Sequence, residues 1–274
     1  MKIYAIKIPD EPISEETFDE LSTLVEEPAR GRLKRFRLPA DSLRSLVARL
    51  TVTWYLNQND LLPEGELPTF GRKGKGKPIL STPILDPPME FNNTHESSFI
   101  LFSILRSHSP LACVGIDIMS PVPDPTEVQE GISYQLTLSE KQSLSIPMSE
   151  DERCKRLMRM WTLKEGFTKA VGEGITFGLE RIEVHLASTQ QAGDIEKVLI
   201  DGKNSVDIGW EYKIGQVEDN YWAVWWRGTD DETEAKAEAN LEGQSQRELD
   251  VINVNWDEFQ GPLSELAERL TTKQ

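Results

Sequence analysis

The sequence predicts an α+β fold in which each half of the chain combines helices with a small, mostly antiparallel sheet. In the first half, the alternating residues Lys2–Ile8 predict a strand, and helical segments follow it. In the second half, the long helical period of Glu150–Val171 precedes a series of short strand-like segments. The sequence contains no repeat of fixed period. The short segments expected to form one antiparallel sheet are 180–187, 196–201, 206–214 and 220–227.

Helices and one strand are predicted for the rest of the first half. Ser14 can cap a helix whose first turn is acidic, and proline at the first helical position favours the next two helices. The polar segment Phe91–His95 leads into a strand at Ser98–Leu105. The two proline-led helices are expected from Pro28 to about Arg37 and from Pro39 to about Asn59.

The second half holds the clearest helix of the chain. In Glu150–Val171 apolar residues recur at helical spacing, and Gly172 is suited to end the helix. The apolar segment Ala112–Ile118 predicts a strand before it. The polar and acidic segment 229–249 predicts an insertion that is disordered or weakly helical, and strand character returns at Val251–Val254.

The composition favours a cytoplasmic protein with a sizeable core. The chain has 274 residues, of which 38% are hydrophobic, enough for one large domain or two smaller lobes. The N-terminus turns acidic at once, so we expect no signal peptide, and no apolar run is long enough to span a membrane. Cys113 and Cys154 suit two free thiols in a reducing compartment and do not make a zinc site.

The charge is unevenly distributed along the chain. A formal net charge of −16 disfavours binding to bulk nucleic acid. Residues 30–49 nevertheless contain seven Arg or Lys residues against the single acid Asp41, whereas 229–250 contains eight acids against two basic residues. A basic patch on an acidic protein indicates a local anionic ligand, although a solvated helix face explains the patch equally well.

Asp117 is the first candidate for chemistry. It lies in an apolar strand between Ile116 and Ile118, and strand alternation places it on the opposite face from both. A carboxylate buried there is unfavourable unless it is paired or bound to a metal ion. Taken alone, an aspartate at the end of a strand that caps a turn explains the residue as well.

Candidate metal and phosphate ligands lie on either side of this strand. Lys164, Glu165 and Lys169 fall within five residues of a helix, where Glu165 and Lys169 could form an ordinary surface ion pair worth about 0.3–0.5 kcal/mol. If partly buried, the same group would suit a metal ion and phosphates together. His95 is either a turn histidine or a phosphate donor. The Gly/Lys segment 71–78 is either a flexible connector or a cationic phosphate-facing loop, and it is not a Walker A motif.

These segments together resemble the signature of the surfactin-type 4′-phosphopantetheinyl transferases. That family has Gly-x-Asp in a strand, followed some tens of residues later by Trp-(Ser/Thr)-x-Lys-Glu-x-x-x-Lys on a helix. The resemblance runs from residue 1 to about 228 and resumes at Val251–Phe259. The matching elements are Gly76-Lys77-Pro78, Phe91-Asn92-Asn93-Thr94-His95, Gly115-Ile116-Asp117 and Trp161-Thr162-Leu163-Lys164-Glu165 with Lys169, together with the opening strand, the Arg-rich helix ending in Phe36, and Arg44.

The resemblance implies an arrangement of the chain in space. It implies two similar lobes related by a pseudo-twofold axis, with coenzyme A in the cleft between them. Residues 1–108 would form the N-terminal lobe. Residues 109–274 would form the C-terminal lobe, which carries the metal site and the acidic insertion at 229–249.

The resemblance also implies roles for individual side chains. Asp117 and Glu165 would hold Mg²⁺, and Glu165 and Lys169 would be catalytic, with Glu165 or a water that it holds as the base. Arg44, Lys77, Thr94 and His95 would contact the 3′-phosphate and adenosine end of coenzyme A. Lys164 and Lys169 would contact the pyrophosphate, and Arg32 is a weaker candidate for the same anionic ligand.

The implied activity is Mg²⁺-dependent transfer of the 4′-phosphopantetheine arm of coenzyme A to a serine of an apo carrier protein, with release of 3′,5′-ADP. The carrier would be of the acyl, peptidyl or aminoadipate-reductase type, and the enzyme a cytoplasmic monomer without nucleic-acid or membrane partners. The sequence departs from many members at Met119, where they have a second acid, because a thioether is a poor ligand for a hard cation. A catalytically weak or inactive homologue that binds coenzyme A or a carrier is therefore the alternative, and an unrelated α+β nucleotide-binding module is a second one.

Overall fold

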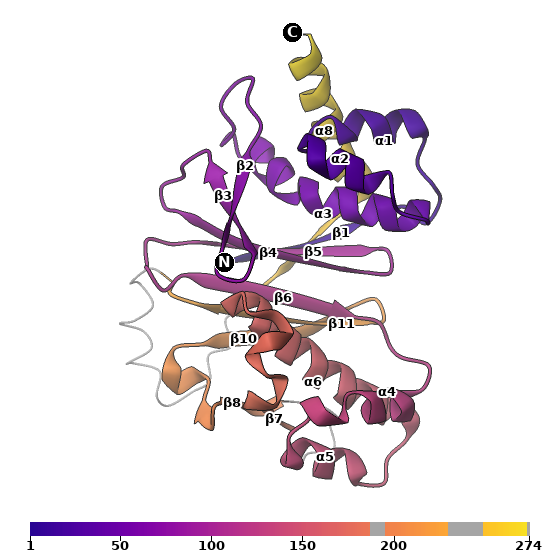
Figure 1. Ribbon diagram of the computed structural model, residues 1–274, viewed down its shortest axis with the longest axis vertical. Coiled ribbons are helices and arrows are strands. Elements are labelled where there is room, and N and C mark those ends of the chain that lie inside the picture. The colour runs from indigo at the N-terminus through magenta and orange to yellow at the C-terminus, as the bar shows by residue number, and fades with distance from the viewer. Residues whose placement is uncertain (187–194, 230–248, 273–274) are drawn as a thin grey trace.

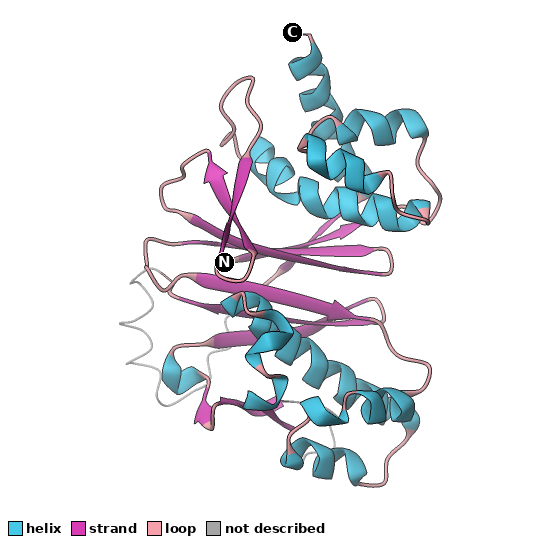
Figure 2. Ribbon diagram, viewed as in Figure 1, coloured by secondary structure: helices cyan, strands magenta, loops and turns pink. Residues whose placement is uncertain are grey.

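Two sheets lie face to face at the centre of the molecule, and helices cover the outer face of each (Figures 1 and 2). This computed structural model describes residues 1–186, 195–229 and 249–272. The expected α+β class, with small, mostly antiparallel sheets and packed helices, is confirmed. The expected pseudo-twofold relation between the lobes stays a prediction, and most of the predicted acidic insertion at 229–249 lies outside the described residues.

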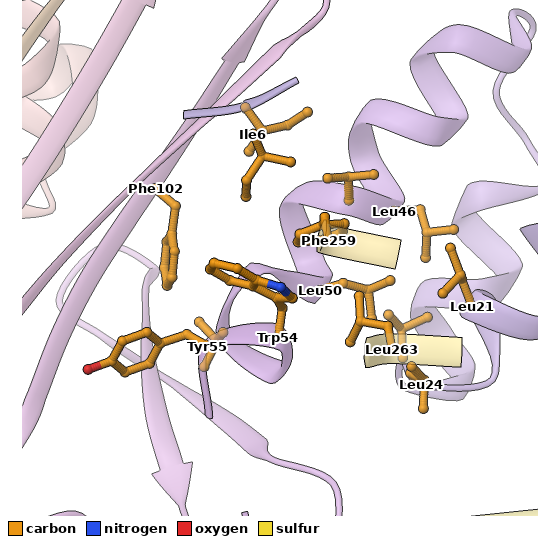
Figure 3. Close-up of a cluster of buried hydrophobic side chains, with 14 of the residues drawn as sticks. Ile6, Leu21, Leu24, Leu46, Leu50, Trp54, Tyr55, Phe102, Phe259 and Leu263 are labelled. Atoms are coloured by element: carbon orange, nitrogen blue, oxygen red, sulfur yellow. The ribbon is translucent and has the colours of Figure 1, made fainter. Parts of the chain in front are cut away.

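The first sheet has the strand order β12-β1-β5-β4. Its strands alternate strictly, so that Tyr4 and Ile6 pack against helices while Ile3 and Ala5 pack against the second sheet. Figure 3 shows the helix-side core, including Trp54, Phe102 and Phe259. In this core the rings of Tyr4 and Trp54 pack edge to face, with their centroids 5.2 Å apart. The elements are β1 (Lys2–Lys7), β4 (Met89–Glu96), β5 (Phe99–Arg106), β12 (Val251–Val254), α1 (Glu15–Ser22), α2 (Glu27–Leu33), α3 (Pro39–Gln58) and α8 (Trp256–Thr271).

The C-terminal segment returns to the first lobe, which corrects the expected assignment of 109–274 to a single C-terminal lobe. Strand β12 pairs in parallel with β1, and Phe259 and Leu263 of α8 are fully buried in the first core. Without β12, β1 would be an exposed edge strand. The residues of a short strand do not reveal which edge it will join, so this pairing could not be predicted from the sequence.

The second sheet has the order β10-β11-β6, and the long helix α6 packs on its outer face (Figure 1). Helix α6 has the predicted bounds, Glu150–Val171, and ends at Gly172 in the left-handed conformation. The segments expected to form one antiparallel sheet divide between this sheet and a separate one of order β7-β8-β9. The elements are β6 (Cys113–Met119), β10 (Glu211–Val217), β11 (Asn220–Arg227), α4 (Pro125–Gly131), α5 (Leu138–Ser145), β7 (Ile182–Leu186), β8 (Ile195–Ile200) and β9 (Lys203–Asn204).

A hairpin of β2 (Thr69–Lys73) and β3 (Lys77–Thr82) contains the Gly/Lys segment that was expected to be a loop. The glycines and lysines of its middle form the tight turn, and its ends are paired strands. Within the described part of the chain, no helix is long and apolar enough to cross a membrane.

Gly115 sets the distance between β6 and α6. A Cβ atom at this position would lie 2.2 Å from the backbone nitrogen of Ala170 and 2.4 Å from the carbonyl oxygen of Gly166. Such distances are not tolerated, so only glycine allows this approach of helix to strand. Asp117, two residues along β6, points to the same side as Gly115, toward α6.

Candidate active site

Asp117 is almost completely buried, at 5% exposure, between the two lobes. Its Oδ1 accepts hydrogen bonds from Lys169 Nζ at 2.6 Å and from Thr94 Oγ1 at 3.2 Å. Its Oδ2 is buried and has no hydrogen-bond partner among the described residues. Burial raises the pKa of Asp117, against the opposing effect of the Lys169 ammonium. The strand thus presents a carboxylate with one oxygen still to be satisfied.

Glu165 lies one helical turn before Lys169 on α6 and contributes the second carboxylate. Burial, and next the negative charge of Asp117, raise the pKa of Glu165, while Lys169 lowers it. Two carboxylates that disfavour each other's charge would both be stabilised by a shared cation. The unsatisfied Asp117 oxygen and this mutual repulsion therefore fit a hard divalent ion such as Mg²⁺.

The protein offers this ion few ligands of its own. No group of three or more His, Cys, Asp or Glu side chains among the described residues is arranged to hold a metal. Met119, at the end of β6, lines the adjacent cleft in place of a third carboxylate. Mg²⁺ commonly takes one or two protein carboxylates and completes its octahedral shell with water and substrate phosphates, so a two-carboxylate site remains suitable for it.

A cleft of about 860 Å³ opens beside Asp117 and extends across the first lobe. This volume is within the range of pockets for small molecules and cofactors. Helix α3 lines it with one face, whose residues recur at helical spacing: Ser45, Ala48, Arg49, Val52 and Thr53. The remaining lining includes Arg32 of α2, Arg72 of β2, Pro78 of β3, Thr94 and His95 of β4, and Lys169 of α6.

Four arginine side chains line this cleft: Arg30, Arg32, Arg49 and Arg72. Burial lowers the pKa of Arg49, and the positive charges of Arg32 and Arg72 lower it further, against Glu26. Such crowding of like charges is unfavourable unless an anion shares them. Arg32 was predicted as a ligand from the sequence, whereas Arg49 was recognised only as part of the basic patch and Arg72 was not predicted. The helical period of the α3 face was a signal that could have identified Arg49.

Thr94, His95 and Lys169 all reach the cleft, as expected of phosphate-binding groups. Partial desolvation lowers the pKa of His95, and the nearby charges of Arg44 and Lys169 lower it further. Arg44 itself does not line the cleft. Its guanidinium donates to the Ser97 carbonyl oxygen at 2.9 Å and forms an ion pair with Asp41.

Asn92, in the same polar segment, has a structural role. Its Oδ1 accepts a hydrogen bond from the backbone nitrogen of Ile116 at 3.0 Å, which ties β4 to β6 across the two sheets. Thr94 lies two residues after Asn92 on β4, and Asp117 lies one residue after Ile116 on β6. The bond between Asn92 and Ile116 therefore holds Thr94 opposite Asp117.

The structure contradicts the expected pyrophosphate contact of Lys164. Its side chain is fully buried on the far side of α6, where Nζ lies 2.9 Å from Glu140 Oε2 and donates to the Leu179 carbonyl oxygen at 2.9 Å. Further acceptors are the carbonyl oxygens of Gln135 and Ile182. One residue along a helix is a rotation of about 100°, so Lys164 faces away when Glu165 faces Asp117.

The structure also contradicts the expected phosphate contact of Lys77. Its side chain is 2% exposed, and Nζ donates to the carbonyl oxygens of Val114 and Ala170. Strand alternation places the next residue, Pro78, at the cleft instead.

Comparisons with known proteins identify the relatives of this chain. Residues 113–213, which include Asp117, Glu165 and Lys169, match the family model described as 4′-phosphopantetheinyl transferase superfamily. A 4′-phosphopantetheinyl transferase, pptA, from Paxillus involutus is 30% identical over 229 residues, covering 79% of this chain and 82% of that protein. The 4′-phosphopantetheinyl transferase psf-1 of Bacillus pumilus is 26% identical, over 70% of this chain and 78% of that protein. An L-aminoadipate-semialdehyde dehydrogenase-phosphopantetheinyl transferase of Xenopus laevis is 28% identical, over 63% of this chain and 58% of that protein.

Proposed function

The chain belongs to the 4′-phosphopantetheinyl transferase superfamily, and on this premise we propose how its cleft transfers the phosphopantetheine arm of coenzyme A to a serine of a carrier protein. The observation that carries the proposal is the buried, unsatisfied oxygen of Asp117 beside Glu165 and Lys169. Asp117 and Lys169 line one end of a cleft large enough for a nucleotide cofactor, whereas Glu165 interacts electrostatically with both of them and is not part of that lining.

Coenzyme A binds along this cleft in the proposed arrangement. Arg32, Arg49 and Arg72 hold its 3′-phosphate, since guanidinium groups recognise phosphate oxygens through paired hydrogen bonds. Thr94, His95 and Lys169 hold the pyrophosphate, which places the reacting phosphorus next to Asp117 and Glu165. These local cationic groups are needed to hold an anionic cofactor, because the protein carries a net charge of −16 and acidic residues such as Glu26 and Glu96 also line the cleft.

Asp117 and Glu165 are the residues that would hold Mg²⁺. An ion held there would supply neutralisation of phosphate charge. The donor set consists of hard carboxylate oxygens, as this cation prefers.

The reaction itself is a displacement at the phosphorus that bears the pantetheine arm. The serine oxygen forms a bond to this phosphorus, the bond to the bridging oxygen breaks, and 3′,5′-ADP leaves. Glu165 accepts the serine proton, directly or through a water that it holds. Lys169 offsets the negative charge that develops during transfer.

Several partner and location assignments belong to this proposal. The carrier is of the acyl, peptidyl or aminoadipate-reductase type, and the name of the Xenopus relative supports the last of these. A monomer is supported because one chain supplies every group of the site. The free thiols of Cys113 and Cys154 support a reducing, cytoplasmic location.

The test is transfer of a labelled phosphopantetheine group to apo carriers of all three types. We expect labelled carrier in the presence of Mg²⁺ and none after chelation with EDTA, with activity restored by added Mg²⁺. Binding of coenzyme A without transfer to any carrier would instead favour the weak or inactive homologue, which the thioether of Met119 makes the second candidate. Failure to bind coenzyme A at all would contradict both.

Arg49→Gln should raise KM for coenzyme A about 10–100-fold, as expected for the loss of one charge-assisted hydrogen bond to phosphate. The value of kcat should not change, because Arg49 is remote from the reacting phosphorus. With 3′-dephospho-coenzyme A, the variant and the wild type should have the same KM. Arg35→Gln, an exposed arginine of the same basic segment outside the cleft, is the control. An equal rise in KM for both cofactors would refute the assignment of the 3′-phosphate to Arg49.

A further inference from the structure

The ammonium group of Lys77 is buried where the two lobes meet. It donates to the carbonyl oxygens of Val114 on β6, at 2.8 Å, and of Ala170 on α6, at 2.9 Å. Glu90 of β4 lies 3.3 Å away and balances its charge. A single side chain on the β2–β3 hairpin of the first lobe therefore holds one strand and one helix of the second.

The contact with Ala170 lies in the last turn of α6. Carbonyl groups in the last turn of a helix have no partner within the helix, and the helix dipole favours a cation there. Gly172 ends the helix with φ of 76°, and a Cβ atom at this glycine would lie 3.0 Å from Cβ of Lys77. The helix end is thus packed tightly against the Lys77 side chain as well as bonded to it.

Both backbone groups held by Lys77 belong to elements that carry the active site. Lys169 immediately precedes Ala170, and Asp117 follows Val114 by three residues. Lys169 in turn donates to Asp117 Oδ1 and to Thr94 Oγ1, at 2.6 and 3.0 Å. A shift of the end of α6 would therefore move Lys169 relative to both of its partners.

We propose that Lys77 is a positioning residue for phosphopantetheine transfer, which fixes the end of α6 and the start of β6 so that Lys169 stays aligned with Asp117. This inference rests on the function proposed above. It assigns Lys77 no contact with coenzyme A, because its side chain points away from the cleft that the adjacent Pro78 lines.

The test separates positioning from binding. Lys77→Met keeps most of the side-chain volume and removes the ammonium. We expect kcat to fall about 10–100-fold, the scale of loss for a misplacement of about 1 Å in an active site. KM for coenzyme A should stay near the wild-type value, and the fall in kcat should be the same with 3′-dephospho-coenzyme A. The stoichiometry of coenzyme A binding gives the folded fraction, so that unfolded protein is not counted as slow enzyme.

Lys73→Met is the matched control. Lys73 lies on the same hairpin and also pairs with Glu90, yet its side chain is 43% exposed and no hydrogen bond joins it to α6 among the described residues. This variant should keep wild-type kcat. If Lys77→Met does not fold, Lys77→Gln, whose amide can still donate one hydrogen bond, is measured in the same way with the same expected loss of kcat.

Two results would overturn the proposal. An unchanged kcat in a folded Lys77 variant would show that the contact does not position the site. A rise in KM that disappears with 3′-dephospho-coenzyme A would show that Lys77 binds the 3′-phosphate directly. Failure of the proposed function would be recognised separately, as a wild-type protein that transfers nothing.

Discussion

Asp117→Asn should lower transfer by about 10²–10³-fold, the usual scale for losing one electrostatic stabiliser of a developing charge, because the variant would lose the cation that supplies it. The amide has the shape of the carboxylate but not its charge, so it cannot hold a divalent cation beside Glu165. Residual activity should no longer rise with Mg²⁺ concentration. The labelled transfer assay, run across a Mg²⁺ series, measures both effects.

The same variant should be at least as stable as the wild type at neutral pH without added metal. Burial raises the pKa of Asp117 in the folded protein above its unfolded value. A carboxyl group whose pKa is raised by folding destabilises the folded state once it is ionised. The free energy of unfolding therefore falls as the pH rises from the pKa of Asp117 in the unfolded chain through its higher pKa in the folded protein. Asparagine removes this penalty, and its Oδ1 can still accept from Lys169 and Thr94. Thermal unfolding at pH 7 measures the effect.

A matched variant separates charge loss at the site from charge loss in general. Asp151→Asn removes an exposed carboxylate at the start of α6, where it pairs with Lys155 at 2.7 Å. It should retain wild-type transfer and Mg²⁺ dependence. Wild-type activity in Asp117→Asn would exclude the carboxylate from the metal site and from the mechanism.

Lys164→Met should lower the free energy of unfolding by about 3–5 kcal/mol, the cost of leaving one partner of a buried ion pair uncompensated. Lys164 and Glu140 are both 0% exposed. Removing the ammonium leaves the Glu140 carboxylate buried beside carbonyl oxygens that have lost their donor. Urea-induced unfolding, followed by tryptophan fluorescence, measures the loss.

The double variant Lys164→Met/Glu140→Gln tests the cause. Glutamine is neutral, so it leaves no uncompensated charge in the core, and its amide oxygen can still accept the hydrogen bond from Val184 N. The double variant should therefore be more stable than Lys164→Met alone. The folded single variant should bind coenzyme A normally. A stable Lys164→Met protein with weakened coenzyme A binding would restore the pyrophosphate contact that the structure contradicts.

The sequence by itself determined the local elements and the identity of the chemical groups. Helix α6 runs over the predicted residues because its apolar period and the terminal Gly172 are local signals. These local patterns placed Glu165 and Lys169 one turn apart on a helix and Asp117 in a strand, but only the resemblance to the family implied that the three side chains share a site. The physical reason is that helix and strand periods are properties of the backbone, independent of the rest of the fold.

The tertiary structure alone decided which way several of these side chains point and which segments meet. Lys164 and Lys77 carry the same charge as Lys169, yet each is buried against carbonyl oxygens on another side of its element. Arg49 and Arg72 come together only because α3 and the β2–β3 hairpin enclose one cleft. Burial and charge balance arise from the packing of elements distant in sequence, and residue order does not encode that packing locally.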